Sequence, residues 1–170
     1  DKYYGYYSMI QELSEILCNT TGFDDISYQS NSGAMGEYSG LLCIKKYHEH
    51  NSENYRDVCL IPESAHGTNF SSAKLAGLKI VKFKDNIEDS EFEELVKKHK
   101  DNLFGLMITY PNTYGLFNEN IKFITQTIHD NGGLIYMDGA NMNAQIGYTS
   151  PATCGADVCH LNLHKTFCIP

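Results

Sequence analysis

Two charged side chains stand at the ends of apolar runs and could together perform chemistry. Lys165 closes the run 158–163, and Asp138 closes the run 134–137. We interpret both runs as buried strands that each present a charged group at the carboxyl end. A lysine there can hold an aldehyde as a Schiff base, and an aspartate can keep a pyridine nitrogen protonated. The pair therefore suggests a pyridoxal phosphate site, although two strand ends with solvated charges would look the same.

A turn of small residues, formed by Ser32, Gly33 and Ala34, offers a place for a phosphate. It lies between a short strand expected at 25–29 and a helix whose apolar stripe begins at Tyr38. Backbone N–H groups can approach an anion closely at small residues, and a helix N-terminus favours negative charge. The spacing matches neither the dinucleotide nor the nucleoside triphosphate motif. Capping of the helix by Ser32 explains the turn equally well.

His66 and Ala140 could complete the environment of a planar ring. His66 lies in a loop at 64–69, after a buried strand, and its imidazole could stack on a cofactor or bond to backbone. Asp138 sits in an apolar setting and therefore requires a partner, for which a pyridinium N–H is suitable. Ala140 is small enough to let an aromatic ring lie close. A capping role for Asp138 is equally compatible with the sequence.

Four residues near the C-terminal end, Cys159, His160, His164 and Cys168, could in principle bind zinc. On one strand, His160 and His164 would share a face but lie about 13 Å apart, too far to share an ion. No cysteine has a recognisable catalytic base beside it in the sequence. The sequence therefore predicts no metal and no cysteine nucleophile.

The composition indicates a globular chain with an acidic surface. Its 170 residues are 42% hydrophobic and carry a formal net charge of −8. This charge argues against nucleic acid or an anionic membrane as the main partner, and no apolar stretch approaches the ~20 residues of a membrane span. The six cysteines form no CxxC pair and lie mostly in apolar runs, which predicts buried free thiols in a reducing compartment. Both ends look cut, so we expect a piece of a longer protein.

Apolar patterning predicts strands that alternate with helices. Strands are expected at 58–61, 78–83 and 103–110, besides the two that end in Asp138 and Lys165. The expected helices span 6–17, 38–44, 71–76, 91–100 and 119–130. This alternation predicts βαβ units and a largely parallel sheet, in which ligands collect at the carboxyl ends of the strands. All the candidate site residues fall at that edge.

Four stretches, at 31–38, 64–69, 136–145 and 160–170, closely resemble the P-protein of the glycine cleavage system. That family comprises pyridoxal-phosphate-dependent glycine decarboxylases, also called glycine dehydrogenase (aminomethyl-transferring). The resemblance covers essentially all 170 residues. It implies an α/β, fold-type-I large domain similar to that of aspartate aminotransferase. Residues 1–170 would form a part of this cofactor-binding domain, truncated at both ends, from the C-terminal half of the family's chain.

The resemblance also assigns roles around the ring of the cofactor. Lys165 would form the internal aldimine, and Asp138 would pair with the pyridine nitrogen. His66 would stack on one face of the ring, and Ala140 would lie on the other. By the same resemblance, Lys165, Asp138 and His66 would be the catalytic residues.

The phosphate of the cofactor would be bound by a second group of residues. The resemblance implies contacts from Ser32, Gly33 and Ala34, together with Thr113 and His164. These five residues would belong to three separate parts of the chain, and the predicted sheet would have to bring them together.

The chain departs from the usual pattern of the family at five positions. Ser30 and Phe70 stand where prolines are common, and Met35 stands where glutamine is common. Asn112 and Tyr114 differ from the usual serine and the usual histidine or asparagine. Of these departures, those at Asn112 and Tyr114 most affect the contacts to a substrate that the family pattern would imply.

The resemblance implies that glycine is decarboxylated and that its aminomethyl group passes to the lipoyl arm of the H-protein. It implies a homodimer or a heteromer of P-protein subunits, in the mitochondrial matrix of a eukaryote or the cytoplasm of a bacterium. Two alternatives stay open. The chain could come from another fold-type-I enzyme, such as an aminotransferase or an amino-acid decarboxylase, or it could be a catalytically incomplete structural fragment.

Overall fold

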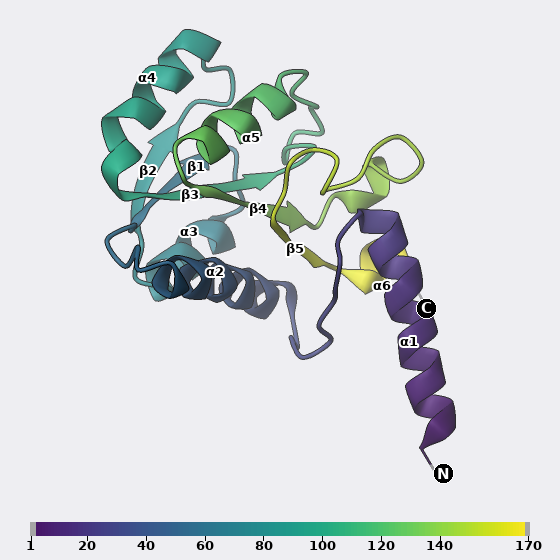
Figure 1. Ribbon diagram of the computed structural model, residues 1–170. Coiled ribbons are helices and arrows are strands. Elements are labelled where there is room, and N and C mark those ends of the chain that lie inside the picture. The colour runs from purple at the N-terminus through teal and green to yellow at the C-terminus, as the bar shows by residue number, and fades with distance from the viewer. Residues whose placement is uncertain (1–2, 169–170) are drawn as a thin grey trace.

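The computed structural model describes residues 3–168 and shows a five-stranded sheet with helices on both faces (Figure 1). The strands are β1 (Val58–Pro62), β2 (Lys79–Phe83), β3 (Leu103–Thr109), β4 (Leu134–Gly139) and β5 (Val158–Leu161). Their order is β2-β1-β3-β4-β5, and every pairing is parallel. The predicted α/β fold with a parallel sheet is therefore confirmed. Residues 169–170, the end of the lysine motif, lie outside the described residues.

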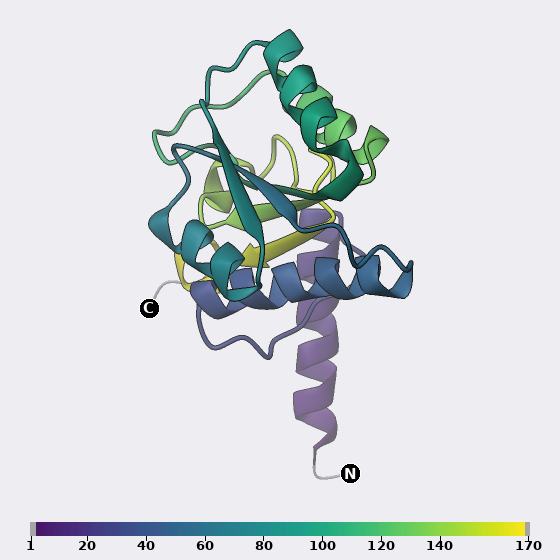
Figure 2. The same ribbon diagram turned by 90° about the vertical axis from the view of Figure 1, so that its left-hand side faces the viewer.

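Helices make the connections between most of the strands. They are α1 (Tyr4–Thr21), α2 (Gly33–His50), α3 (Gly67–Leu75), α4 (Asp89–His99), α5 (Ile121–Asp130) and α6 (Leu163–Thr166), with short 3-10 turns at Lys100–Asn102 and Met142–Ala144. Helices α2 and α3 cover one face of the sheet, and α4 and α5 cover the other (Figures 1 and 2). Helices on both faces are expected when parallel strands are joined by crossover connections.

The core is divided between the two faces because side chains alternate along each strand. Leu60 and Leu106 belong to the cluster under α4 and α5, where the predicted apolar stripe of α5 is buried. Ile61, Met107 and Tyr136 belong to the cluster under α2 and α3. Burial of both faces explains why β1 and β3 read as continuous apolar runs in the sequence.

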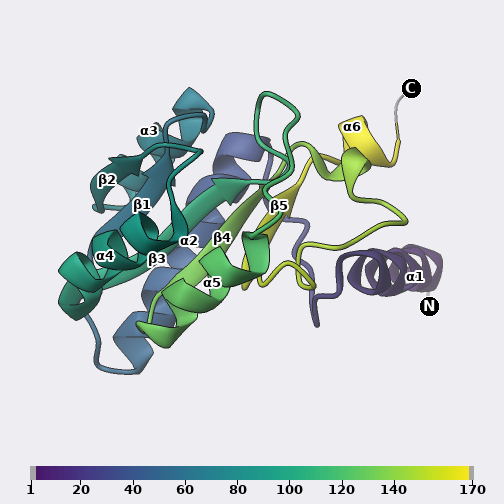
Figure 3. The same ribbon diagram turned by 90° about the horizontal axis from the view of Figure 1, so that it is seen from above.

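Helix α1 confirms the predicted first helix but projects away from the body of the molecule (Figures 1 and 3). It ends at Gly22, whose φ of 80° is the left-handed conformation that glycine favours after a helix. Its apolar residues Met9, Ile10 and Ile16 are exposed, and Leu17 is buried. No helix among the described residues has the length and apolar character needed to cross a membrane.

The predictions for the segments that precede α2 and α3 are wrong. Residues 25–29 form no strand, because Asp25 and Ser27 side chains accept hydrogen bonds from nearby backbone N–H groups and compete with sheet pairing. Helix α3 begins at Gly67 rather than Ser71, so the predicted loop at 64–69 is shorter. The imidazole of His66 caps this helix by accepting from the Thr68 N–H.

The sequence predicted that Lys165 lies at the end of a strand, and this prediction is wrong. Strand β5 ends at Leu161, and the Asn162 carbonyl then accepts hydrogen bonds from the N–H groups of Lys165 and Thr166. Lys165 and His164 therefore lie on the short helix α6 that follows the strand. His160 and His164 consequently do not share a strand, so the spacing argument against zinc does not apply. The described residues contain no group of three or more potential metal ligands.

All six cysteines are free thiols, but their burial differs from the prediction. Cys59 and Cys154 are buried, whereas Cys43 and Cys168 are exposed. Burial raises the pKa of the Cys59 thiol to about 12, which keeps it protonated at neutral pH.

Candidate active site

The carboxyl ends of the five parallel strands lie at one edge of the sheet, which is beside α3 and α6 in Figure 3. Parallel pairing places Thr109 of β3, Asp138 of β4 and His160 of β5 side by side. The loop that follows β1 carries His66, and the loop that follows β3 carries Thr113. In a sheet of this kind the edge formed by the carboxyl ends is where ligands bind.

Asp138 is buried, with 3% of its surface exposed, and its carboxylate is surrounded by hydrogen-bond donors. The Asn69 side-chain amide donates to Oδ2 at 2.9 Å, and the Ala140 N–H donates to Oδ1 at 2.9 Å. His160 Nε2 lies 3.4 Å from Oδ1. Among the described residues, no lysine or arginine pairs with this carboxylate. A buried carboxylate that lacks a permanent cationic partner suits a ligand that brings its own positive charge, such as a pyridinium.

His160 lies beside this carboxylate and contacts Tyr136, and neither residue was among those predicted to form the site. The Tyr136 hydroxyl lies 2.5 Å from His160 Nδ1, and both side chains are buried. Burial raises the pKa of Tyr136 well above its usual value, and the negative charge of Asp138 raises it further. The phenol therefore keeps its proton. Only the register of β4 and β5 brings these residues together, and a single sequence does not reveal it.

Cys159 lies next to His160 on β5 and is not a nucleophile. Burial raises the pKa of its thiol strongly, and the charge of Asp138 adds to the effect. Because the thiolate is the reactive form, the thiol is unreactive at neutral pH.

The N-terminus of α2 rests on β5 through glycines. A Cβ at Gly33 would lie 2.9 Å from the Asn162 side-chain nitrogen, and a Cβ at Gly36 would lie 2.8 Å from His160 Cβ. Ser32 caps the helix by accepting a hydrogen bond from the Met35 N–H at 3.2 Å. The helix N-terminus predicted to bind phosphate thus packs beside His160 and Asn162, and the predicted capping by Ser32 is confirmed.

His66 is exposed, and it lies beside a threonine that is bonded to a buried carboxylate. Its Nδ1 accepts from the Thr68 N–H at 3.3 Å, and the Thr68 hydroxyl donates to Glu37 Oε1 at 2.7 Å. Ser72 donates to Glu37 Oε2 at 2.8 Å. Glu37 is only 3% exposed, so both carboxylate oxygens are satisfied inside the interface of α2 and α3. Glu37 could not be singled out from the sequence, because a glutamate in a helix usually faces solvent.

The remaining predicted residues lie at the open side of this edge. The side chains of Lys165 and His164 are exposed, and within the described part of the chain neither forms a side-chain hydrogen bond or ion pair. Ala140 follows β4 and is partly exposed. Among the described residues, no hydrogen bond or ion pair joins Lys165 to Asp138. The lysine amine is therefore accessible for covalent attachment of a ligand.

Thr113 is held by the loop that precedes α3. Its hydroxyl donates to the Ser64 carbonyl at 2.6 Å, so its proton is already used. The Asn141 side chain donates to the carbonyls of Pro111 and Asn112, which joins the loops after β3 and β4. A phosphate could receive a hydrogen bond from Thr113 only if the bond to Ser64 were broken.

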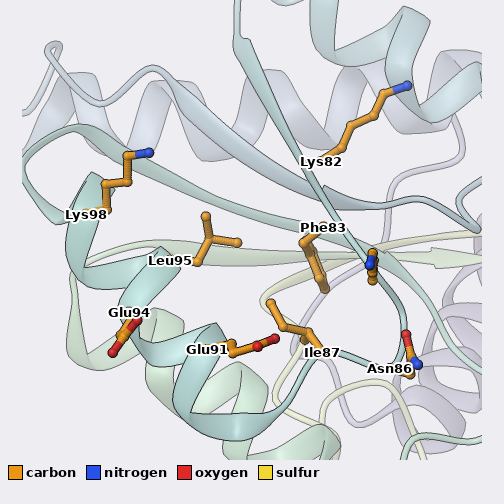
Figure 4. Close-up of a pocket in the computed structure, with 9 residues that line it drawn as sticks. Lys82, Phe83, Asn86, Ile87, Glu91, Glu94, Leu95 and Lys98 are labelled. Atoms are coloured by element: carbon orange, nitrogen blue, oxygen red, sulfur yellow. The ribbon is translucent and has the colours of Figure 1, made fainter.

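A hollow of about 680 Å³ lies elsewhere, between β2 and α4 (Figure 4). Phe83, Ile87 and Leu95 form its apolar part, and the charged side chains around them include Lys98 and Glu91. None of the residues at the carboxyl ends of β3, β4 and β5 lines this hollow. It is separate from the candidate site.

Comparison with known proteins identifies close relatives in sequence. The chain is 56% identical over 170 residues to the mitochondrial glycine dehydrogenase (decarboxylating) of Pisum sativum. It is 57% identical over 170 residues to the glycine dehydrogenase (decarboxylating) of Christiangramia forsetii. Both alignments cover 98% of this chain, but the chain spans only 16% and 18% of the respective relatives. No protein-family model matches the sequence.

Solved structures show where else this fold occurs. The SepCysS–SepCysE N-terminal domain complex matches with a TM-score of 0.74 and 17% identity, over 92% of this chain and 42% of the matched chain. Mouse CSAD matches with a TM-score of 0.69 and 16% identity, over 92% and 38%. A PLP-bound C–S lyase from Staphylococcus hominis matches with a TM-score of 0.63 and 14% identity, over 92% and 42%. These likenesses support the predicted fold class. The sequence identities, which are far higher, relate this chain to one part of the glycine dehydrogenases (decarboxylating) and confirm the family resemblance predicted from its motifs.

Proposed function

We propose that the whole protein containing this chain is a pyridoxal-phosphate-dependent glycine dehydrogenase that decarboxylates glycine. The observation that carries the proposal is the identity of more than half of the residues with proteins of that name, over nearly the whole chain. The chain spans about a sixth of those relatives. The activity is therefore proposed for the longer protein, of which residues 1–170 form part of the cofactor-binding domain.

The residues at the sheet edge fit the proposed cofactor. Lys165 would hold it covalently, and Asp138 would face its pyridine nitrogen. His66 and Ala140 would flank the ring. When bound, pyridoxal phosphate supplies an electron sink for the electron pair left on the α-carbon of glycine as carbon dioxide departs.

Asp138 has the environment that this task requires. Its oxygens accept hydrogen bonds from Asn69 and Ala140, and its burial makes an opposite charge beside it strongly favourable. An ionised Asp138 would hold a proton on the pyridine nitrogen. This is the contribution of the chain to electron withdrawal, since a protonated ring accepts electrons more readily.

The phosphate is proposed to bind at the N-terminus of α2. Ser32 is its N-cap residue, and Gly33 and Ala34 lie in its first turn, where backbone N–H groups have no partner within the helix. His164 is exposed on α6 and could add a contact. Thr113 is the weaker candidate, because its hydroxyl donates to Ser64.

The proposed partners follow from the same relationship. The substrate is glycine, and the acceptor of the aminomethyl group is the lipoyl arm of the H-protein. The protein is proposed to act as a homodimer or as a heteromer of P-protein subunits. The name of the Pisum sativum relative places that protein in the mitochondrion. We extend this to the mitochondrial matrix for a eukaryotic source and to the cytoplasm for a bacterial one.

Isotope exchange tests the proposed reaction directly. The full-length protein, loaded with pyridoxal phosphate, is incubated with glycine and labelled bicarbonate, with and without lipoylated H-protein. We expect label to enter the carboxyl carbon of glycine, and H-protein to increase the rate. Exchange into another amino acid but not into glycine would instead indicate a different fold-type-I enzyme.

A further inference from the structure

The pair formed by Tyr136 and His160 has no role in the function proposed so far. We propose that this pair positions the Asp138 carboxylate and keeps its negative charge available to the cofactor. The inference rests on the proposed function, because it concerns the same carboxylate. In these terms His160 is a positioning residue for Asp138, and Tyr136 is a positioning residue for His160.

Three buried side chains, those of Tyr136, His160 and Asp138, contact one another in succession. Tyr136 and Asp138 lie on β4 with their side chains on the same face, and Asp138 pairs in register with His160 on β5. The Tyr136 hydroxyl lies 2.5 Å from His160 Nδ1, and His160 Nε2 lies 3.4 Å from Asp138 Oδ1. All three side chains are at least 92% buried. Solvent therefore cannot take the place of either contact.

The direction of the hydrogen bonds follows from the chemistry of each group. The Tyr136 phenol keeps its proton, because burial and the Asp138 charge raise its pKa. It therefore donates to His160 Nδ1, which must accept through its lone pair. In the neutral imidazole the hydrogen is then on Nε2, the nitrogen that faces Asp138. This tautomer presents a donor, rather than a lone pair, to the carboxylate.

The same bond fixes the orientation of the His160 ring. Because the Tyr136 hydroxyl donates to Nδ1, the imidazole is held with Nε2 towards Asp138. Without that hydroxyl the ring could turn or take the other tautomer, and a lone pair would then face the carboxylate.

His160 also connects the two ends of the proposed cofactor site. A Cβ at Gly36 would lie 2.8 Å from His160 Cβ, and a Cβ at Gly33 would lie 3.3 Å from His160 Nε2. The first turn of α2 thus rests on the imidazole that faces Asp138. A change in the orientation of His160 would move the phosphate end and the pyridine end together.

Cofactor affinity in the full-length protein tests this inference. The dissociation constant for pyridoxal 5′-phosphate is measured on the cofactor-free protein for Tyr136→Phe, with Tyr110→Phe as the matched control. Tyr110 is also a buried tyrosine whose hydroxyl donates once, to the Asn118 carbonyl at 3.2 Å. We expect Tyr136→Phe to weaken binding about tenfold, the effect of losing a hydrogen bond that supports a charged group. Tyr110→Phe should stay within about twofold of the wild type.

A pair of His160 variants separates positioning from packing. In His160→Gln the amide nitrogen can take the place of Nε2 and donate to Asp138. In His160→Asn the shorter side chain can still meet Tyr136 but cannot reach Asp138. We expect the Gln variant to bind pyridoxal 5′-phosphate more tightly than the Asn variant, at comparable melting temperatures of the cofactor-free proteins.

The absorbance spectrum of the bound cofactor supplies a readout that a merely structural role would not change. Protonation of the pyridine nitrogen alters this spectrum, so Tyr136→Phe should shift it towards that of Asp138→Asn. Wild-type affinity and spectrum in Tyr136→Phe, or a lower melting temperature with an unchanged spectrum, would overturn the inference while Asp138→Asn still weakens binding. Wild-type affinity in Asp138→Asn would overturn the cofactor assignment itself, and the inference with it.

Discussion

At the scale of single residues, the site depends on buried carboxylates whose oxygens are all occupied. Asp138 accepts from an amide and a backbone N–H, and Glu37 accepts from two hydroxyl groups. An isolated buried carboxylate would be very unfavourable, so these donors are what allow the charges to remain inside. The donors Thr68, Asn69 and Ser72 all lie on α3, so Glu37 fixes α3 against α2, and Asp138 fixes α3 against β4.

Glu37→Ala should destabilise the chain by about 1–3 kcal/mol, because it leaves the Thr68 and Ser72 hydroxyls buried without an acceptor. Glu37→Gln should cost less, since its amide oxygen still accepts one of the two hydrogen bonds. Urea unfolding of the 170-residue chain measures both changes. Glu93→Ala is the control, because the ion pair of Glu93 with Lys97 is exposed, and its loss should cost under about 0.5 kcal/mol. Equal effects of Glu37→Ala and Glu93→Ala would contradict this account.

Some site residues could be predicted from the sequence because their immediate neighbours in the chain indicate their position. Asp138 stands after an apolar run, and His66 stands beside a glycine in a loop. Tyr136, His160 and Glu37 could not be predicted, because their partners lie far away in the sequence. In the sequence Tyr136 resembles an ordinary core residue of a strand. Only the pairing of β4 with β5 shows that its hydroxyl contacts His160.

At the scale of elements, close packing of α2 on the sheet sets the position of the site. A Cβ at Gly40 would lie 2.5 Å from Tyr136 Cε2 and 3.0 Å from Val158 Cγ1. The helix can therefore approach β4 and β5 only because Gly40 has no side chain. Gly33 and Gly36 have the same function nearer to the N-terminus of the helix.

Gly40→Ala should destabilise the chain by about 1–3 kcal/mol, since the added methyl group overpacks the core beneath α2. Gly5→Ala in α1 is the matched control, because a Cβ there meets nothing within 4 Å. That substitution should be neutral or stabilise the helix by up to about 1 kcal/mol. Thermal unfolding followed by circular dichroism distinguishes the two, and a neutral Gly40→Ala would show that α2 does not pack as described.

The elements that could be predicted are those with a clear period and a clear stop. Apolar runs closed by Pro62 and Pro111 gave correct strands, and Gly22 marked the end of α1. The errors fall where side chains compete with the backbone. Ser27 and Asp25 bond to neighbouring N–H groups instead of allowing a strand, and the His66 ring begins α3 early. Such local hydrogen bonds do not change the pattern of apolar and polar residues from which helices and strands are predicted.

At the scale of the whole molecule, one arginine joins parts of the chain that are distant in sequence. Arg56 donates to the carbonyls of Leu103 at 3.0 Å and Asn131 at 3.3 Å, and it pairs with Glu53. It therefore links the segment before β1 to the start of β3 and the end of α5. This contact lies at the edge of the sheet opposite the candidate site.

The pH dependence of stability should reveal this ion pair. The hydrogen bond from Arg56 lowers the pKa of Glu53 below its ordinary value of 4.5, and a bond from His48 contributes. A carboxyl group whose pKa is lower in the folded state stabilises the fold above the unfolded pKa and loses that effect as pH falls through the folded pKa. Glu53→Gln should thus lower stability at pH 7, and the difference from the wild type should shrink as pH falls below about 4.5. Urea unfolding at several pH values measures it, and a difference that did not change with pH would contradict the assignment.

The central claim is that Lys165 holds pyridoxal phosphate at the edge formed by the carboxyl ends of the strands. The most direct measurement is mass spectrometry of peptides from the full-length protein after incubation with pyridoxal phosphate, borohydride reduction and digestion. Lys79→Ala serves as the control, because Lys79 pairs with Asp57 and lies in β2. We expect the cofactor on the peptide that contains Lys165 in the wild type and in Lys79→Ala, and no attached cofactor in Lys165→Ala. Attachment to another lysine in the wild type, or an undiminished yield of modified protein in Lys165→Ala, would contradict the account.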